Sequence, residues 1–150
     1  METTEIRMDS VPKLVGDIWG SMLGMEITPT VTGGEAAIAG YYTAWVRVIG
    51  SQNITVILRC PDLLARKAVA AMFSCPLEEV APDQIRDGLK EIVNILGGNL
   101  KGMMTKYHFL SMPAVSEPDR EPRFPTGDII GQFNFQSQGQ GLQLTLLKVD

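Results

Sequence analysis

A carboxylate and an amide, Glu91 and Asn94, stand three positions apart in a segment whose apolar residues recur every three or four positions. This period predicts a helix with its apolar stripe toward the core, and it makes Glu91 and Asn94 close neighbours on the solvent face. The core needs neither side chain. Because an amide carries both hydrogen-bond donors and an acceptor, the pair could contact a partner, although most exposed pairs of this kind only face water.

The helix that carries this pair is expected to begin near Pro82 and to run to about Tyr107. Its predicted apolar stripe consists of Ile85, Leu89, Ile92, Val93, Leu96, Leu100, Met103 and Tyr107. The opposite side of the same helical wheel holds Asp87, Glu91, Asn94, Gly98, Lys101 and Thr105. The spacing therefore predicts one face for the core and one polar face for solvent or for a partner.

Glycines at 97, 98 and 102 interrupt this otherwise good helix sequence. A glycine in a helix interior is less favourable than alanine by about 1 kcal/mol. Gly98 lies one turn beyond Asn94 on the polar face, where the missing side chain would let another protein come close. Alternatively the helix breaks at Gly97-Gly98, because paired glycines are also a stop signal.

The elements around this helix follow from period and composition. A first amphipathic helix is expected over 10–23, ended by Gly24, and a second helix over 61–75. β-Branched and aromatic residues over 35–59 predict a hairpin with a four-residue connection, 50–53, and strict alternation over 129–146 predicts another. Hairpins in sequence favour an α+β fold with two layers, in which the helices pack on one face of a mostly antiparallel sheet.

The chain of 150 residues is predicted to form one domain, 1–150, with a flexible N-terminus over 1–9 and a proline-rich loop over 111–127. Its net charge of −4 argues against nucleic acid and against an anionic membrane surface. We find no secretory signal and no apolar run long enough to cross a bilayer, so we expect a cytoplasmic protein.

The sequence gives little indication of a metal site or of a catalytic nucleophile. His108 is the single histidine, and Cys60 and Cys75 form no CxxC pair, so no metal site of the protein's own is expected. The glycine-rich stretch 97–102 contains a lysine but lacks the spacing of a phosphate-binding loop. His108 is expected at a helix end or a strand start.

Glu91-Ile92-Val93-Asn94, followed by Gly98 and Lys101, resembles the signature helix of the CheX-like chemotaxis phosphatases, the CheC/CheX/FliY group. The hairpin and alanine-rich helix over 45–73 and the first helix ending at Met22-Leu23-Gly24 are similar to that family as well. The resemblance covers roughly residues 10–149, without the loop at 111–127. It implies a CheX-like fold for this chain.

Members of this family remove the phosphoryl group from the aspartyl-phosphate of CheY-type response regulators. The resemblance implies that Asn94 enters the regulator's active site and positions the attacking water, while Glu91 anchors the helix on a lysine of the regulator. Asp87, Gly98 and Lys101 would complete the partner-binding face. An aspartyl-phosphate is already activated and needs mainly positioning and charge neutralisation. No cofactor of the protein's own is therefore implied, and Mg²⁺ would sit on the regulator.

Two further expectations follow from the resemblance. The stretch from Asp17 to Gly24 lines up with Glu91 to Gly98 as a trace of an internal repeat, but Gly20 stands in place of the asparagine, which implies a single active site. Exposed sheet edges and the family resemblance favour a homodimer. The alternative functions are a non-catalytic signalling domain that binds a response regulator or another partner, and a domain whose exposed pair does nothing.

Overall fold

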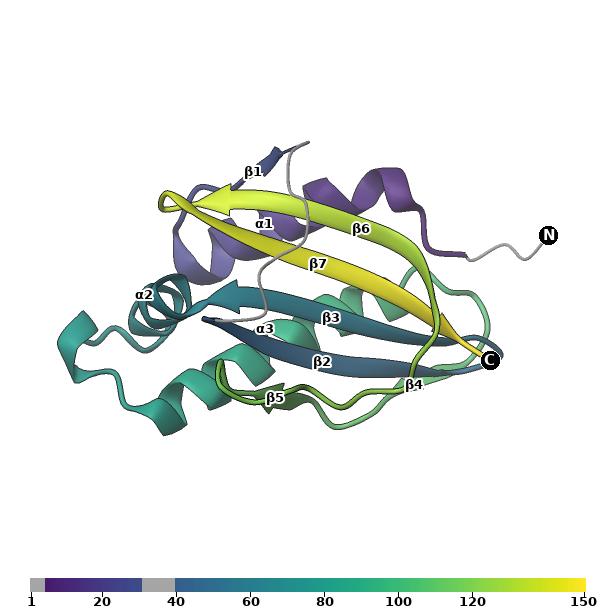
Figure 1. Cartoon of the computed structure of the whole chain (residues 1–150). Coiled ribbons are helices and arrows are strands. Elements are labelled where there is room, and N and C mark those ends of the chain that lie inside the picture. The colour runs from purple at the N-terminus through teal and green to yellow at the C-terminus, as the bar shows by residue number, and fades with distance from the viewer. Residues whose placement is uncertain (1–4, 31–39) are drawn as a thin grey trace.

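Four long strands form the centre of the structure: β2 (Tyr41–Gly50), β3 (Asn53–Pro61), β6 (Asp128–Ser137) and β7 (Gln140–Val149) (Figure 1). They pair antiparallel in the order β6-β7-β3-β2. The computed structural model describes residues 5–30 and 40–150, so the expected strand residues 35–39 lie outside the described part. Short strands extend both edges, since β1 (Thr28–Thr30) pairs with β6, while β4 (His108–Leu110) and β5 (Ala114–Ser116) both pair with β2.

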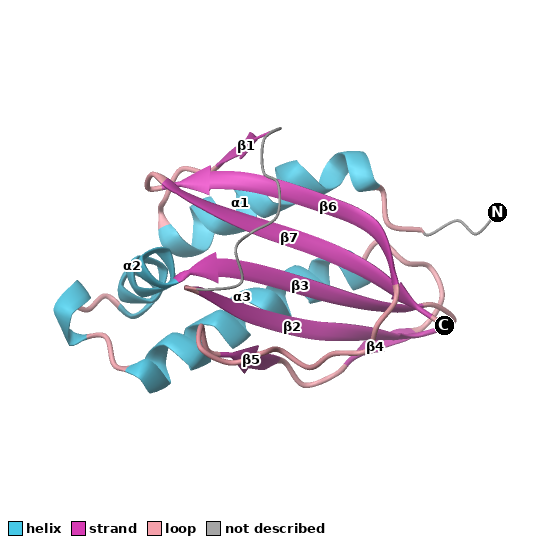
Figure 2. Cartoon of the chain, in the orientation of Figure 1, coloured by secondary structure: helices cyan, strands magenta, loops and turns pink. Residues whose placement is uncertain are grey.

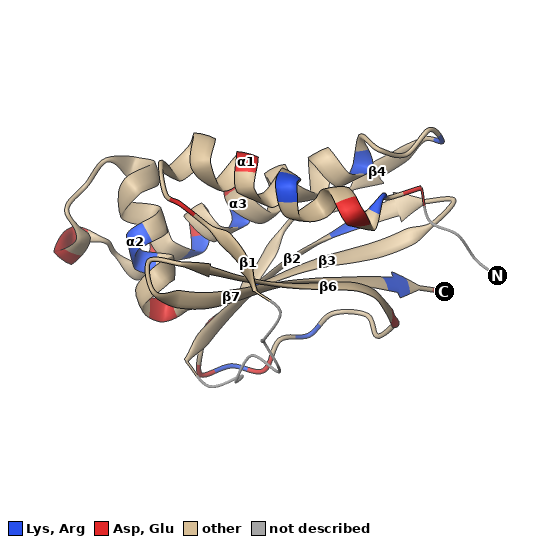
Figure 3. Cartoon of the chain, turned by 90° about the horizontal axis from the view of Figure 1, so that it is seen from above, with Lys and Arg blue, Asp and Glu red and all other residues tan. Residues whose placement is uncertain are grey.

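The helices gather on one face of this sheet (Figures 2 and 3). They are α1 (Val11–Leu23), α2 (Asp62–Phe73) and α3 (Pro82–Lys101), with short 3-10 turns η1 (Met8–Ser10) and η2 (Leu77–Glu79). The expected two-layer α+β fold is thereby confirmed. Gly24 ends α1 in the left-handed conformation, at φ 64°, as its position in the sequence predicted.

The core lies between the helices and the inward side chains of the strands. Alternate residues of β2, among them Val46 and Val48, are fully buried against the helical stripes. The indole Nε1 of Trp19 in α1 donates a 3.0 Å hydrogen bond to Ser137 Oγ at the end of β6. Ser137 Oγ in turn donates to the carbonyl of Glu26, so the one polar atom of this buried ring is satisfied.

Helix α3 is continuous but shorter than expected. It passes through Gly97-Gly98 without a break, so the alternative of two shorter helices is wrong. It ends at Lys101, not near Tyr107, because the chain must turn to bring His108 beside Gly50 at the edge of β2. Tyr107 is consequently 83% exposed and not part of the apolar stripe.

The region expected to be a proline-rich loop, 111–127, is partly ordered as sheet. The Ser111 N–H donates to the Arg47 carbonyl of β2, and the Arg47 N–H donates to Ser111 Oγ. Residues 114–116 form β5. The expected connection of the first hairpin is also shorter, because positions 50 and 53 belong to the strands. Residues 114–116 pair with the outer edge of β2, and no local pattern in the sequence predicts such pairing.

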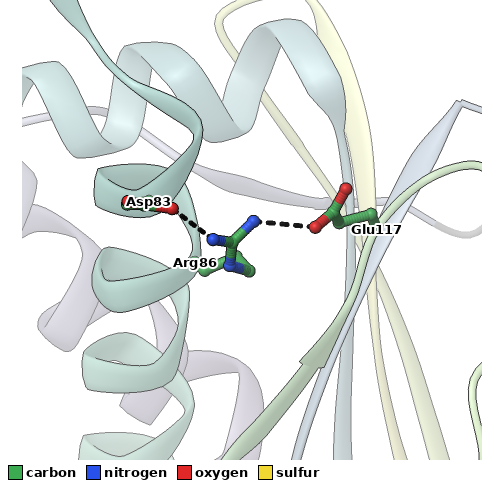
Figure 4. Close-up of polar contacts among 3 residues, drawn as sticks. All are labelled: Asp83, Arg86 and Glu117. Atoms are coloured by element: carbon green, nitrogen blue, oxygen red, sulfur yellow. Dashed lines mark hydrogen bonds and ion pairs between the residues drawn. The ribbon is translucent and has the colours of Figure 1, made fainter.

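Residues 117–127 leave β5 and pass over the sheet face opposite the helices before they enter β6 (Figures 1 and 3). The Phe124 ring packs against Trp45 of β2 in an edge arrangement, with ring centroids 5.6 Å apart. At the other end, Arg86 of α3 reaches Glu117 through a 2.7 Å ion pair and also pairs with Asp83 of its own helix (Figure 4). The segment is therefore attached to the sheet and to α3.

The N-terminal residues are attached as well, against the expectation of a flexible segment over 1–9. Ile6 is buried in the core, and the Glu5 carboxylate accepts hydrogen bonds from the Thr105 N–H at 2.6 Å and the Thr105 hydroxyl at 2.7 Å. Residues 1–4 lie outside the described part. These contacts hold the N-terminal segment to the turn that follows α3.

Replacing Glu5 with glutamine should make this attachment independent of pH. The two Thr105 donors lower the pKa of Glu5 from its usual 4.5. The Glu5 carboxyl group therefore binds its proton more weakly in the native state than in the unfolded chain. The carboxylate's stabilisation is therefore fully present above pH 4.5 and is lost as the pH falls through the lowered pKa. The melting temperatures of wild type and Glu5→Gln should converge on acidification below pH 4.5; a constant difference down to pH 3 would contradict this.

Candidate partner-facing site on helix α3

The ends of helix α3 are well specified by its sequence. Pro82 occupies the first turn, where its missing N–H costs nothing, and Gln84 Oε1 accepts a 2.9 Å hydrogen bond from the Ala81 N–H. Asp83 in the first turn and Lys101 in the last both suit the helix dipole. Both ends of α3 are therefore stabilised, so the helix can hold the side chains on its outer face in defined positions.

One face of α3 is buried over its whole length. Its fully or almost fully buried apolar residues are Ile85, Leu89, Ile92, Val93, Leu96 and Leu100. They pack against β2, α2 and neighbouring strands, and Gly88 lets α2 come so close that a Cβ there would lie 2.5 Å from Val69 Cγ2. Rotation of α3 about its axis is thereby fixed, so its polar residues must point outward.

The sequence-predicted site residues all lie along this outward face. Asp87 and Glu91 are exposed, while Asn94, Gly98 and Lys101 are half-buried. Within residues 5–30 and 40–150, the side chains of Glu91 and Asn94 make no hydrogen bond or ion pair. Since no described residue engages their polar groups, both side chains can bond to a partner.

Gly97 and Gly98 have different structural roles. A Cβ at Gly97 would lie 2.6 Å from Val46 Cγ1 and 3.3 Å from Leu110 Cδ2, so this glycine is needed for packing of α3 on the sheet. A Cβ at Gly98 would meet only Leu110 Cδ1, at an ordinary 3.8 Å. The fold therefore does not require glycine at position 98, which is the one that lies on the predicted partner-binding face.

Two residues near the predicted site did not figure in the sequence prediction. Lys90, which is half-buried, lies one turn before Asn94 on the same face, and the i, i+4 spacing alone would have revealed it. Leu110 of β4 reaches Gly97-Gly98 from the sheet edge, and no local signal in the sequence indicates that contact. The face of α3 thus combines acidic, basic and amide groups with an aliphatic neighbour.

The remaining chemistry-bearing residues lie elsewhere. His108 begins β4 and is buried, with Nδ1 donating to the Lys106 carbonyl at 2.7 Å. Burial raises the pKa of the Cys60 thiol. On helix α1, Asp17 pairs with Lys13 at 2.9 Å, and the space beside Gly20 is open. None of these groups joins Glu91 and Asn94.

In the part of the chain that the structure describes, no three His, Cys, Asp or Glu side chains are grouped so that they could hold a metal ion. Across the same residues, no helix has the length and apolar character needed to span a bilayer.

The profile of the family described as chemotaxis phosphatase CheX matches residues 42–121, and no curated protein sequence matches the chain. The fold is similar to the chemotaxis protein CheX from Vibrio vulnificus, with a TM-score of 0.76 and 16% identity over 98% of this chain and 99% of that one. The chemotaxis protein CheX from Desulfovibrio desulfuricans has a TM-score of 0.74 and 15% identity, over 97% of this chain and 99% of that one.

A third similar structure is the CheX-CheY-BeF3-Mg²⁺ complex from Borrelia burgdorferi. It gives a TM-score of 0.70 and 12% identity, over 97% of this chain and 99% of that one. At such identities the likeness to these structures concerns the fold.

Proposed function

Because the chain belongs to the CheX family of chemotaxis phosphatases, we propose that it hydrolyses the aspartyl-phosphate of a CheY-type response regulator. The observation that carries this proposal is the outward pair Glu91 and Asn94, whose side chains make no hydrogen bond or ion pair with the residues that the structure describes, on a helix fixed by packing. The Borrelia relative, solved together with CheY and Mg²⁺, supports the class of partner.

In the proposed reaction, α3 lies against the regulator's active site and Asn94 acts on the attacking water. The amide oxygen accepts a hydrogen bond from the water, and the amide NH₂ donates to a phosphoryl oxygen, so one side chain aligns both reactants. The water oxygen forms a bond to phosphorus while the bond from phosphorus to the aspartyl oxygen breaks. The regulator's aspartate carboxylate is re-formed and inorganic phosphate leaves with both protons of the water, one of which it exchanges with solvent.

The charges of this step are divided between the two proteins. Mg²⁺ on the regulator would neutralise the phosphoryl oxygens, and we propose no cofactor held by this chain itself. Glu91 would pair with a lysine of the regulator and hold the helix in register. Asp87, Gly98 and Lys101 extend the same face in both directions, and Lys90 brings a cation next to Asn94. A cytoplasmic location follows if the partner is a response regulator.

The experiment that tests this function follows the decay of phosphorylated response regulators, taken one by one from the same organism, with and without the protein. Faster decay for at least one regulator is expected. Binding of a phosphorylated regulator without any change in its phosphate lifetime would replace the proposal with a non-catalytic signalling domain. If the protein binds no regulator and accelerates the decay of none, the exposed pair has no function of this kind.

Replacing Glu91 with alanine is expected to weaken docking more than chemistry. Loss of one partly exposed ion pair should raise the concentration needed for half-maximal acceleration about threefold to thirtyfold, while the rate at saturation falls less. Glu78→Ala, an exposed glutamate on η2, is the matched control and should behave as wild type. Unchanged concentration dependence in Glu91→Ala would contradict the anchoring role.

We also propose a homodimer. Strand β4 lies at one edge of the sheet, and an edge strand offers backbone groups with which a second chain can pair. Size-exclusion chromatography with light scattering should give about twice the 16.4 kDa of one chain. A monomer at micromolar concentration would refute this part of the proposal and leave the phosphatase proposal standing.

A further inference from the structure

A cavity of about 640 Å³ lies away from α3's outward face. It is formed by Trp45 of β2, by the end of strand β5 and by the first residues of the segment that crosses the sheet. Its volume falls in the range of small-molecule sites. None of the residues proposed to face the regulator lines it, so the cavity has no part in the proposed phosphatase reaction.

The apolar side of this cavity is a fixed aromatic ring. Trp45 is half-buried, and the edge contact with Phe124, at 5.6 Å between centroids, restrains its indole. Val115 of β5 adds an aliphatic surface beside it. A restrained indole at a cavity wall is a favourable surface for a flat ring, because stacking on it needs little further ordering of the protein.

The polar side carries two guanidinium groups, those of Arg120 and Arg123. Neither makes an ion pair with any residue that the structure describes. The Glu117 carboxylate, which also lines the cavity, is held by Arg86 at 2.7 Å (Figure 4), and the Glu117 carbonyl accepts the Arg120 N–H at 2.9 Å. The two arginines are thus left with one unengaged carboxylate, that of Glu121.

We propose that this cavity binds a nucleotide. The base would lie against Trp45, and Arg120 and Arg123 would bind the phosphate, for which the planar guanidinium fork is well suited. The mixed polar lining suits this class of ligand, because the exposed Glu121 carboxylate would accept a hydrogen bond from a ribose hydroxyl or a base amino group. An inorganic phosphate ion has no ring to occupy the apolar side. Mononucleotides and cyclic dinucleotides share this chemistry.

Tryptophan fluorescence of the full chain tests the proposal directly. The only other tryptophan, Trp19, is 2% exposed and hydrogen-bonded within the core, so a change in emission reports on Trp45. AMP, GMP, ATP, GTP, a cyclic dinucleotide and inorganic phosphate are titrated separately, with calorimetry on the same samples. A saturable response to at least one nucleotide is expected, and comparison of the arms identifies which kind binds.

The Arg120→Ala, Arg123→Ala double variant should bind that nucleotide about tenfold more weakly or worse, since hydrogen bonds to a charged phosphate are lost. Arg66→Ala removes an exposed arginine of α2 and is the matched control, expected to bind as wild type. Absence of binding by both methods for every nucleotide overturns the proposal. So does an equal response to inorganic phosphate, or wild-type affinity in the double variant.

Discussion

Asn94→Ala should abolish the acceleration of regulator dephosphorylation, with a loss of about a hundredfold or more in the catalysed rate. The amide would be the only group of this chain that contacts the attacking water, and alanine can neither accept from water nor donate to phosphate. The stability of the fold should change little. Asn94 makes no internal hydrogen bond among the described residues, and alanine favours a helix, so the free energy of unfolding should stay within about 0.5 kcal/mol of wild type.

Asn99→Ala provides the matched control on the same helix. Asn99 is exposed, and its Nδ2 donates to the Ile95 carbonyl of its own helix at 2.9 Å, so its role is local. Phosphate decay and urea unfolding are measured for both variants. An Asn94→Ala protein that is folded and fully active would show that the assigned mechanism is wrong, whereas loss of activity together with unfolding would assign Asn94 a structural role instead.

Gly97→Ala is expected to have the largest effect on stability. The new Cβ would lie 2.6 Å from Val46 Cγ1, and Val46 is a stiff β-branched residue, fully buried in a long strand, that cannot rotate away. Overpacking of this kind destabilises by about 1–3 kcal/mol, which exceeds the roughly 1 kcal/mol that alanine gains in helix propensity. Urea unfolding should therefore show a net loss despite the better helix former.

Gly98→Ala is the adjacent control with the opposite expectation. Its Cβ would contact Leu110 Cδ1 at 3.8 Å, so the propensity gain of up to about 1 kcal/mol should appear as added stability. If the regulator's backbone approaches Gly98, this more stable variant should nevertheless dephosphorylate the regulator more slowly. Equal stabilities of the two alanine variants would refute the packing argument.

Much of the helical structure could be predicted because a 3.6-residue period is a local signal. The first helix ends at Gly24 as expected, and the stripe from Ile85 to Leu100 is buried. The same period continued by chance through Met103 to Tyr107, where the chain leaves the helix to reach the edge of β2. Pattern alone could not distinguish these cases, because the turn is imposed by a distant strand.

The short edge strands escaped prediction for a related reason. Three residues are too few to show alternation, and β4 and β5 exist because β2 offers them an unpaired edge. In β6, the expected alternation fails at Ile129, which is 60% exposed because a bulge between Ile129 and Gly131 shifts the register. The residue types of the candidate site were predictable from the helix face, whereas the Leu110 contact depended on this non-local pairing.

The residues of helix α3 that fix it in the core and the residues proposed to act on the regulator are largely different, since the buried stripe from Ile85 to Leu100 does not include Glu91 or Asn94. Selection can therefore act on the two sets separately. A lineage could lose the proposed activity by changing one or two codons and still inherit an intact, fully stable fold. Gly20 of α1, which the sequence aligns with Asn94, has no amide, so a single active site per chain stays a prediction, and Gly20→Asn is the change that would restore an amide there.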